Sequence, residues 1–237
     1  MQDVDLRVDA NRIVSVIGPN GAGKTTFFNC LSGIYRPDGG VILLDGRDIT
    51  GREPHQVCKL GMSRTFQNIR LFPEMSVLEN VLVAQFQHRS ITPLPLLLRS
   101  KSFCGEEKLS REEAHSFLDF VGLAHLADAV SSNLAYGLQR RLEIARALAT
   151  KPRILLLDEP AAGMNPQEAV EMVQLISRIR ERGLAILLIE HHMKVVMSIS
   201  DEILVLDHGV PIAHGAPEKV RNDPQVIKAY LGEEISN

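Results

Sequence analysis

The stretch Gly18-Pro19-Asn20-Gly21-Ala22-Gly23-Lys24-Thr25-Thr26 decides the fold class of this chain. It has the pattern G-x-x-x-x-G-K-T, which is typical of a phosphate-binding loop. The β-branched run Ile13–Ile17 before it predicts a buried parallel strand, and Thr25–Leu31 after it predict the first turns of a helix. Strand, loop and helix therefore stand in the order that the motif requires.

Such a loop binds phosphate through its backbone. Its glycines let the chain curl so that successive N–H groups point at a polyphosphate, and the helix start adds partial positive charge there. We expect Lys24 to reach the β- and γ-phosphates and the Thr25 hydroxyl to hold Mg²⁺. A chance glycine-rich turn before a helix is the alternative, which the flanking strand and helix disfavour.

Composition limits the classes of protein that this chain can represent. Its 237 residues, 45% of them hydrophobic, fit one large α/β domain or one domain with a subdomain. The net charge of −3 gives no basic character that would indicate a nucleic-acid partner. Cys30, Cys58 and Cys104 are spaced too widely for a disulfide framework or a zinc site, which favours a reducing cytosolic location.

The sequence contains neither a targeting segment nor a membrane span that we can identify. Asp3 and Asp5 interrupt the first residues, so no signal peptide is predicted. The densest apolar run, Ile91–Leu98, contains two prolines and is far shorter than the roughly 18–20 residues of a span. We therefore expect any link to a membrane to come through a partner protein.

Alternating strands and helices predict a mostly parallel, covered sheet as the core of the chain. Further strands are expected at Val41–Leu44, which leads into Asp45-Gly46, and at Ile154–Glu159, Leu184–Ile189 and Ile203–Gly209. A helix is expected over Pro166–Arg182, because Asn165 is a good N-cap, Glu168 stands three residues later and Gly183 follows the last turn.

Residues from about 76 to 150 differ in character and predict a helical subdomain inserted into the α/β core. Val77–Leu82 has helical spacing, Gln139–Thr150 consists of strong helix formers, and Arg111–Gly122 carries apolar residues on one face. Ser90–Ser110 shows no clear period, so we predict a connector there.

Two adjacent carboxylates close the apolar strand at Ile154–Glu159, where ligands of parallel sheets gather. We expect Asp158 to hold Mg²⁺ directly or through water, and Glu159 to orient or deprotonate an attacking water. Consecutive strand residues point to opposite faces, so separate roles are favoured over a shared one. The alternative is a solvated acidic strand end.

Three weaker signals gain weight from these motifs. His191 follows a core strand and can donate a hydrogen bond to a γ-phosphate oxygen, although a lone His is more often an incidental surface or cap residue. Gln67 can contact the metal ion or the water through its amide. Leu134–Leu138 precedes a helix and is either a second anion site or an ordinary helix entry, and the physics favours neither.

Five motifs now stand in one order and carry a resemblance to a known family. They are Gly18–Thr26, Gln67, Leu134–Leu138, Ile154–Glu159 and His191. The chain resembles the nucleotide-binding domain of ABC transporters over essentially its whole length. Three stretches are similar, in particular, to the ATP-binding subunits of prokaryotic branched-chain amino acid uptake systems; they are Arg64–Phe72, Leu134–Arg146 and Ile227–Glu233.

The resemblance implies a fold and a mechanism. The fold would be an α/β P-loop domain with a helical insert and a small N-terminal antiparallel β part. Two such domains pair head to tail, and each ATP lies between the phosphate loop of one and the signature residues of the other, here Ala135, Tyr136 and Gly137. Glu159, His191 and Gln67 would serve hydrolysis, with Mg²⁺ held by Thr25, Gln67 and Asp158. Closure around ATP would shift the membrane subunits between access states.

The same resemblance implies partners and a location. The partners would be transmembrane permease subunits and a second ATPase subunit, identical or different, with a different one favoured in the complex. An extracytoplasmic solute-binding protein would act indirectly. The chain would lie at the cytoplasmic face of the cell membrane as a peripheral subunit and be soluble when isolated.

Several residues depart from the common family pattern. In the usual signature L-S-G-G-Q, this chain has Ala135, Tyr136 and Leu138 in place of Ser, Gly and Gln. Ala135 has no hydroxyl for a partner's γ-phosphate, so we expect unequal ATP sites if the second subunit is a different one. Asn165 stands where Asp is common, and His192 stands where Asp usually follows the His.

The start of the chain departs furthest from the pattern. The family normally carries an aromatic residue upstream of the phosphate loop that stacks on adenine, and residues 1–17 contain none. Either the chain starts late, through truncation or a misassigned start, or adenine is held otherwise. We expect ATP to bind more weakly than to a longer form, by on the order of 1 kcal/mol for one stacking contact.

Functions other than an amino acid importer are compatible with parts of this pattern. The same ATPase role could serve urea, short amides or lipid export, and the sequence does not identify the solute. A nucleotide-gated regulatory module with slow hydrolysis is disfavoured by Glu159. A DNA-acting ATPase would need a long coiled-coil insert or paired domains, and a small-molecule kinase would leave Leu134–Leu138 and His191 unexplained.

Overall fold

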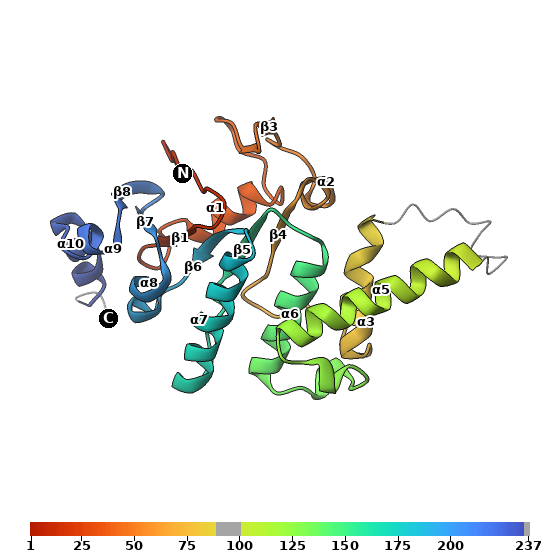
Figure 1. The fold of residues 1–237 in the computed structure, drawn as a ribbon. Coiled ribbons are helices and arrows are strands. Elements are labelled where there is room, and N and C mark those ends of the chain that lie inside the picture. Colours follow the sequence, from red (N-terminus) through yellow and green to blue (C-terminus); the bar gives the residue numbers. More distant parts are fainter. Residues whose placement is uncertain (89–100, 235–237) are drawn as a thin grey trace. The chain divides into compact units, whose positions relative to one another are not determined.

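The computed structural model describes residues 1–88 and 101–234 of the chain. The chain divides into two compact units (Figure 1). The first unit joins Met1–Gln67 to Arg153–Asn237, and the second consists of Asn68–Pro152.

A six-stranded sheet with the order β4-β5-β6-β1-β7-β8 forms the centre of the first unit. The strands are β1 (Ile13–Ile17), β4 (Met62–Arg64), β5 (Ile154–Asp158), β6 (Ala185–Ile189), β7 (Glu202–Asp207) and β8 (Val210–Gly215). All neighbours pair in parallel except β7 and β8. Every residue of β1, β5 and β6 is buried, as in a parallel sheet that is covered on both faces. The prediction of a mostly parallel sheet is confirmed.

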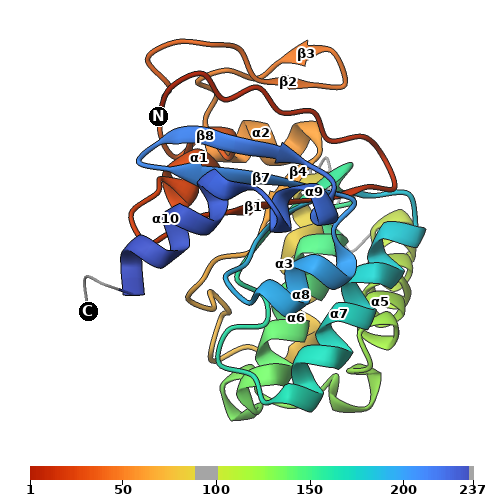
Figure 2. The same ribbon diagram turned by 90° about the vertical axis from the view of Figure 1, so that its left-hand side faces the viewer.

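Helices of the first unit cover the two faces of this sheet (Figure 2). One face packs against α1 (Lys24–Leu31) and α2 (Pro54–Leu60) through Phe27, Phe28 and Val57. The other packs against α8 (Met193–Ile199), α9 (Pro217–Arg221) and α10 (Pro224–Glu234) through Val196, Val220 and Val226. Val205 and Leu206 of β7 belong to opposite faces, because side chains alternate along a strand.

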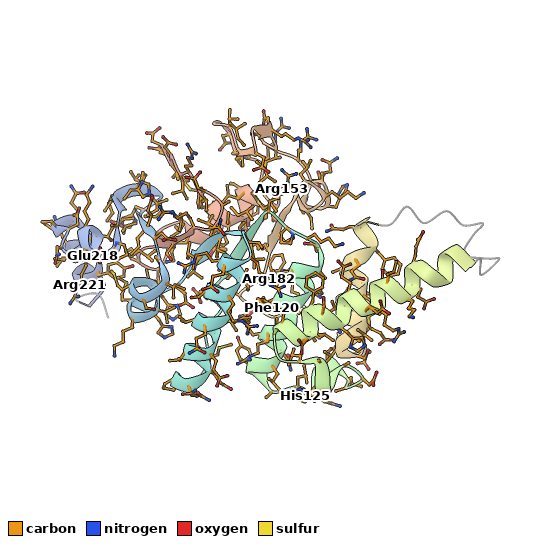
Figure 3. The ribbon with its side chains drawn as sticks, viewed as in Figure 1. Phe120, His125, Arg153, Arg182, Glu218 and Arg221 are labelled. Atoms are coloured by element: carbon orange, nitrogen blue, oxygen red, sulfur yellow. The ribbon has the colours of Figure 1, made fainter. Side chains whose placement is uncertain are left out.

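A second, two-stranded antiparallel sheet lies in the N-terminal part of the first unit. It pairs β2 (Leu43–Leu44) with β3 (Arg47–Asp48). The turn between them has φ of 48° at Asp45 and 75° at Gly46, which suits a two-residue hairpin with both central residues in the left-handed region. Arg153, labelled in Figure 3, forms an ion pair with Asp45. The small antiparallel part that was predicted is therefore present, with a shorter first strand.

The start of α7 and the strand expected near the C-terminus were also predicted from the sequence. Helix α7 (Pro166–Glu181) begins where predicted: the Asn165 side chain accepts from the Glu168 backbone N–H, and the Glu168 carboxylate accepts from the Asn165 N–H. This reciprocal cap fixes the helix start. The strand expected at Ile203–Gly209 is the first arm of a hairpin, since β8 follows the turn at His208 and Gly209.

Helices make up the second unit. Helices α3 (Val77–Gln85), α5 (Lys101–Phe120) and α6 (Tyr136–Ala149) pack on one another in pairs. The described part of this unit also contains the short 3₁₀ turns η1 (Phe86–His88), η2 (Ala124–Leu126) and η3 (Ser131–Asn133). Phe120 and His125 in Figure 3 mark the end of α5 and the turn that follows it. The Ser76 side chain accepts from the Glu79 N–H and caps α3.

The prediction of a connector over Ser90–Ser110 was wrong for its second half, because α5 begins at Lys101. Residues 105–109 are all exposed, so this part of the helix has no apolar face from which a period could be seen. Its helical register is fixed further on, where Ala114 and Leu118 are fully buried. The first half of the predicted connector lies outside the described residues.

Candidate functional site

The phosphate loop leaves the end of β1 and enters α1, as the motif predicts. Gly18 has φ of 150°, and a Cβ added there would lie 2.0 Å from the carbonyl oxygen of Leu206 in β7. Only glycine fits this close approach between two neighbouring strands. Gly23, with φ of 96°, caps α1 in the left-handed conformation.

Backbone contacts and Lys24 hold the loop in shape. The Gly209 N–H donates to the Ala22 carbonyl at 3.0 Å, which ties the loop to the β7–β8 turn. The Lys24 ammonium donates to the carbonyl oxygens of Gly18 at 2.6 Å and of Pro19 at 2.8 Å. The Thr25 and Thr26 residues are exposed at the start of α1. The loop thus places a cation, hydroxyl groups and a helix N-terminus together, which suits a polyphosphate.

The two adjacent carboxylates have different surroundings. Asp158 ends β5 and is buried, and its Oδ2 accepts from Arg64 Nη2 at 2.8 Å. Glu159 lies just past the strand with φ of 47°, and its N–H donates to the Ile189 carbonyl. Because the backbone turns at Glu159, its carboxylate points in a different direction from that of Asp158. Different environments favour the separate roles predicted for the pair, and those roles stay predictions.

Three residues proposed for hydrolysis converge in the first unit. Gln67 Nε2 donates to Glu159 Oε2 at 3.0 Å, and His191 Nδ1 lies 3.6 Å from the same oxygen. Strands β4, β5 and β6 are neighbours and parallel, so their carboxyl ends meet at one edge of the sheet. Gln67 follows β4, Glu159 follows β5 and His191 follows β6 closely, which explains why residues so distant in sequence meet here.

Arg64, at the end of β4, was not predicted as a site residue. Besides Asp158, its guanidinium donates to Asn29 Oδ1 at 2.7 Å and Ser32 Oγ at 3.1 Å. It also lies over the rings of Phe28 and Phe66, at 5.4 and 5.1 Å from their centroids. Arg64 therefore links Asp158 to the helix after the phosphate loop. A lone Arg at a strand end gives no signal of this in sequence.

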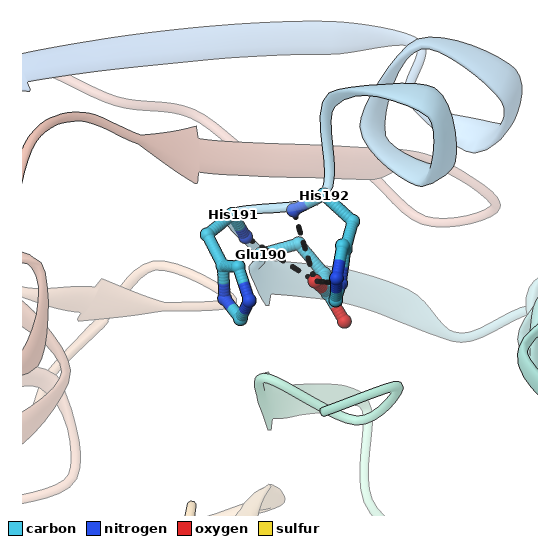
Figure 4. A group of neighbouring side chains, drawn as sticks. All are labelled: Glu190, His191 and His192. Atoms are coloured by element: carbon cyan, nitrogen blue, oxygen red, sulfur yellow. Dashed lines mark hydrogen bonds and ion pairs between the residues drawn. The ribbon is translucent and has the colours of Figure 1, made fainter. Parts of the chain in front are cut away.

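Glu190 was also missed. It follows β6, is fully buried, and stands next to His191 and His192 (Figure 4). Its carboxylate accepts from backbone N–H groups on both sides of the β5–β6 edge, from Ala161 at 3.0 Å and His191 at 3.2 Å. The only sequence signal was a carboxylate at the end of a buried strand.

The signature residues Leu134–Leu138 lie in the second unit, at the start of α6. Ala135 is the N-cap of the helix without a side-chain cap, and Gly137 is buried in its first turn. The helix begins at Tyr136, three residues earlier than predicted. The Tyr136 hydroxyl accepts from Arg140 Nη2 at 3.3 Å, and Gln139 Nε2 donates to the Leu134 carbonyl at 2.8 Å. The loop is thus fixed by its own helix.

A cavity of about 800 Å³ lies beside α1 in the first unit. Thr26, Phe27, Cys30 and Tyr35 are among the residues that line it. Burial raises the pKa of the Cys30 thiol, because the thiolate is less well solvated there.

The residues expected to hold Mg²⁺ supply the right donor type. The Thr25 hydroxyl, the Asp158 carboxylate and the Gln67 amide oxygen are all hard oxygen donors, which this ion prefers. All three belong to the first unit. No helix within the described ranges is both long enough and apolar enough to cross a membrane.

Comparison with known proteins identifies the family. The profile of the ABC transporter family matches residues 1–162, and that of the branched-chain amino acid ATP-binding cassette transporter matches residues 210–236. Because the first profile spans more than half of the chain, this chain belongs to the ABC transporter family, and its fold is that of an ATP-binding cassette.

Two of the similar relatives are named for branched-chain amino acid transport, and a less similar one is named for lipopolysaccharide export. BraF of Pseudomonas aeruginosa, a high-affinity branched-chain amino acid transport ATP-binding protein, is 52% identical and is matched over 97% of this chain and 91% of its own length. LivG of Escherichia coli, of the same description, is 51% identical over 98% and 92%. The lipopolysaccharide export ATP-binding protein LptB of Haemophilus influenzae is 35% identical over 99% and 92%.

Solved structures support the fold. An ATP-binding cassette of an ABC transporter in its ADP conformation has a TM-score of 0.83 and 34% identity, covering 97% of this chain and 91% of that one. A dimeric cassette in a post-hydrolysis state, bound to ADP and phosphate, has a TM-score of 0.76 and 25% identity, with coverage of 92% and 90%.

Proposed function

We propose that this chain is the ATP-binding and ATP-hydrolysing subunit that energises a membrane importer of branched-chain amino acids. The observation that carries hydrolysis is the convergence of Gln67 and His191 on the Glu159 carboxylate, at the sheet edge where the phosphate loop also begins. The solute is inferred from the relatives named for branched-chain amino acid transport, which are more similar than the lipopolysaccharide export protein.

Each site residue has a task in this proposal. Residues Gly18–Thr26 bind the phosphates through backbone N–H groups, the Lys24 ammonium and the helix start. Thr25, Asp158 and Gln67 would hold Mg²⁺, which neutralises charge that develops on the phosphate oxygens. Glu159 takes a proton from the attacking water or orients it, and Gln67 and His191 hold the Glu159 carboxylate in place. His191 also donates to the γ-phosphate.

The composite site needs a second subunit in this proposal. Ala135, Tyr136 and Gly137 would contact the ATP held by a partner ATPase subunit, with a different subunit favoured over an identical one. Transmembrane permease subunits would receive the conformational change, and a solute-binding protein would deliver the amino acid to them. The chain would then work as a peripheral subunit at the cytoplasmic face of the membrane.

The ATPase role is tested by steady-state hydrolysis of MgATP by the full chain. Glu159→Gln is expected to lower kcat by about 100-fold or more, since a general base contributes about 10²–10⁴-fold, while MgATP still binds. Lys24→Ala should weaken binding of MgATP instead. Glu181→Gln, an exposed carboxylate at the end of α7, is the matched control and should hydrolyse ATP like the wild type. Full activity of Glu159→Gln would refute the assignment.

The solute is tested separately in cells that depend on this gene for uptake. Glu159→Gln should abolish uptake of labelled leucine, isoleucine and valine and leave unrelated amino acids unaffected. Unchanged uptake of these three, with a loss of urea, short-amide or lipid transport, would keep the ATPase role and replace the solute.

A further inference from the structure

Glu190 has a buried carboxyl group that the proposed reaction does not use directly. The residue follows β6 and is 0% exposed. Its Oε1 accepts from the Ala161 N–H at 3.0 Å, and its Oε2 accepts from the N–H groups of His191 at 3.2 Å and His192 at 3.4 Å. Figure 4 shows the carboxylate with the two His residues around it.

These backbone donors explain how the carboxylate can be buried. An isolated carboxylate is costly to remove from water, whereas N–H donors directed at its oxygens stabilise the ionised form. An aliphatic side chain could fill the same volume without this requirement. The carboxylate therefore does more than fill volume. Through its hydrogen bonds, it joins the loop after β5 to the loop after β6.

Both loops carry residues of the proposed reaction. Ala161 lies two residues after Glu159, and its N–H is held by one carboxylate oxygen of Glu190. His191 is held by the other oxygen through its own N–H. His191 Nδ1 in turn lies 3.6 Å from Glu159 Oε2. Glu190, His191 and the Glu159–Ala161 turn thus form a closed ring of contacts that includes two of the proposed reacting groups.

We propose that Glu190 is a positioning residue for ATP hydrolysis: its buried carboxylate clamps the Glu159–Ala161 turn to the His191 backbone and so sets the distance between Glu159 and His191. Glu190 itself touches no substrate. This inference rests on the proposed function, because it assigns a role through Glu159 and His191.

A metal ion is the competing explanation for this cluster. One ligand atom each from Glu190, His191 and His192 lies within 4.8 Å of the others. However, both Glu190 oxygens already accept backbone N–H groups, and the side chains of His191 and His192 are about half exposed, at 51% and 53%. The backbone contacts favour a clamp over a cation site, and a variant of His192 separates the two.

The test compares kcat, KM and MgATP affinity of the full chain with those of Glu190→Gln. The amide has nearly the same shape, but it can accept at one atom only and its NH₂ faces an N–H donor. We expect kcat to fall about 10- to 100-fold, as misplacement of a reacting group by about 1 Å would cause, with KM and affinity changed less than about twofold. Equal losses in affinity and kcat would overturn the inference.

A double variant tests whether Glu190 acts through His191. In the His191→Ala background, Glu190→Gln should lower kcat much less than it does in the wild type, because the effects of residues that act through one contact are not additive. The same fold-loss in both backgrounds would overturn the inference. If Glu190→Gln fails to fold, Glu190→Asp keeps the charge but shortens its reach, and it should show the same selective loss of kcat; an unchanged kcat would overturn the inference.

His192→Ala removes the imidazole of the candidate metal cluster, whose Nδ1 lies 3.5 Å from Glu190 Oε2, and keeps the backbone N–H that Glu190 holds. It should retain kcat within about twofold, and a Co²⁺ titration of the wild type should show no saturable absorption change. Binding of Co²⁺ that disappears in His192→Ala would overturn the clamp. Loss of the proposed function itself would look different: the wild type would lack MgATP hydrolysis, or Glu159→Gln would keep it.

Discussion

Each of the two units contains a buried arginine that pairs with a carboxylate of the same unit, and the two pairs differ in what they connect. Arg64 pairs with Asp158 in the first unit, and Arg140 pairs with Glu143 in the second, both at 2.8 Å and with side chains no more than 5% exposed. Arg64 joins segments 94 positions apart, whereas Arg140 and Glu143 are three apart on one helix. The first pair depends on how the sheet is assembled, and the second only on α6 being helical.

The difference shows what each pair can do. Arg64 also contacts Asn29 and Ser32 of α1 and its C-terminal end, so it connects a proposed Mg²⁺ ligand to the helix that follows the phosphate loop. Arg140 reaches back to the Tyr136 hydroxyl and so stiffens the signature residues from within their own helix. The same chemistry thus serves long-range assembly in one unit and local order in the other.

The largest effect is expected when the long-range pair is broken. Arg64→Met leaves the Asp158 carboxylate buried without its guanidinium, and the free energy of unfolding should fall by about 3–5 kcal/mol. Urea denaturation measures this. Arg12→Met is the matched control in the same unit, because the Arg12–Asp201 pair is half exposed on the arginine side. The free energy of unfolding of Arg12→Met should fall by less than about 1 kcal/mol. Equal decreases for Arg12→Met and Arg64→Met would contradict the prediction.

Replacing both partners sharpens the comparison. Arg140→Met with Glu143→Leu should recover most of the roughly 3–5 kcal/mol that Arg140→Met loses alone, since an apolar pair can replace a buried ion pair. MgATP binding by the phosphate loop should then be normal. Arg64→Met with Asp158→Leu should recover stability in the same way but hydrolyse no ATP. Hydrolysis by this second double variant would show that Asp158 does not hold Mg²⁺.

A smaller loss is expected from the phosphate loop itself. Gly18→Ala places a Cβ against the Leu206 carbonyl, so the loop and β7 must separate. Overpacking of this kind costs about 1–3 kcal/mol, and thermal unfolding together with MgATP affinity would measure both consequences. Gly39→Ala is the control, because a Cβ there meets nothing within 4 Å and its φ is not positive. A stable Gly18→Ala variant with normal affinity would refute the geometric argument.

The smallest effects come from helix caps, one in each unit. Asn165→Ala and Ser76→Ala each remove a side-chain oxygen that accepts from the third helical N–H, and each should cost about 1 kcal/mol. Chemical denaturation of the two variants measures this directly. Ser116→Ala, in the exposed body of α5, should change stability by less than about 0.5 kcal/mol. A cap variant as stable as Ser116→Ala would contradict the assigned role of its hydrogen bond.

Local chemistry was enough for several features. The pattern from Gly18 to Lys24 specifies a strand–loop–helix unit, because its glycines and helix start act within a few residues. The box formed by Asn165 and Glu168 fixes the start of α7 in the same way. Helical spacing identified the helix that carries Val77–Leu82 and most of the one expected over Arg111–Gly122, which ends at Phe120. Each of these depends on hydrogen bonds or periodicity within one segment, which the order of residues shows directly.

Tertiary structure alone decided the rest. In α5, residues 105–109 are all exposed, so the periodicity is visible only from the buried residues that follow. Arg64 meets Asp158, and Glu190 meets Ala161, because β4, β5 and β6 are parallel neighbours whose carboxyl ends share one edge. Sequence determined which chemical groups end these strands. Only the strand order determined which of them meet, since that order arises from packing the whole sheet between its two layers of helices.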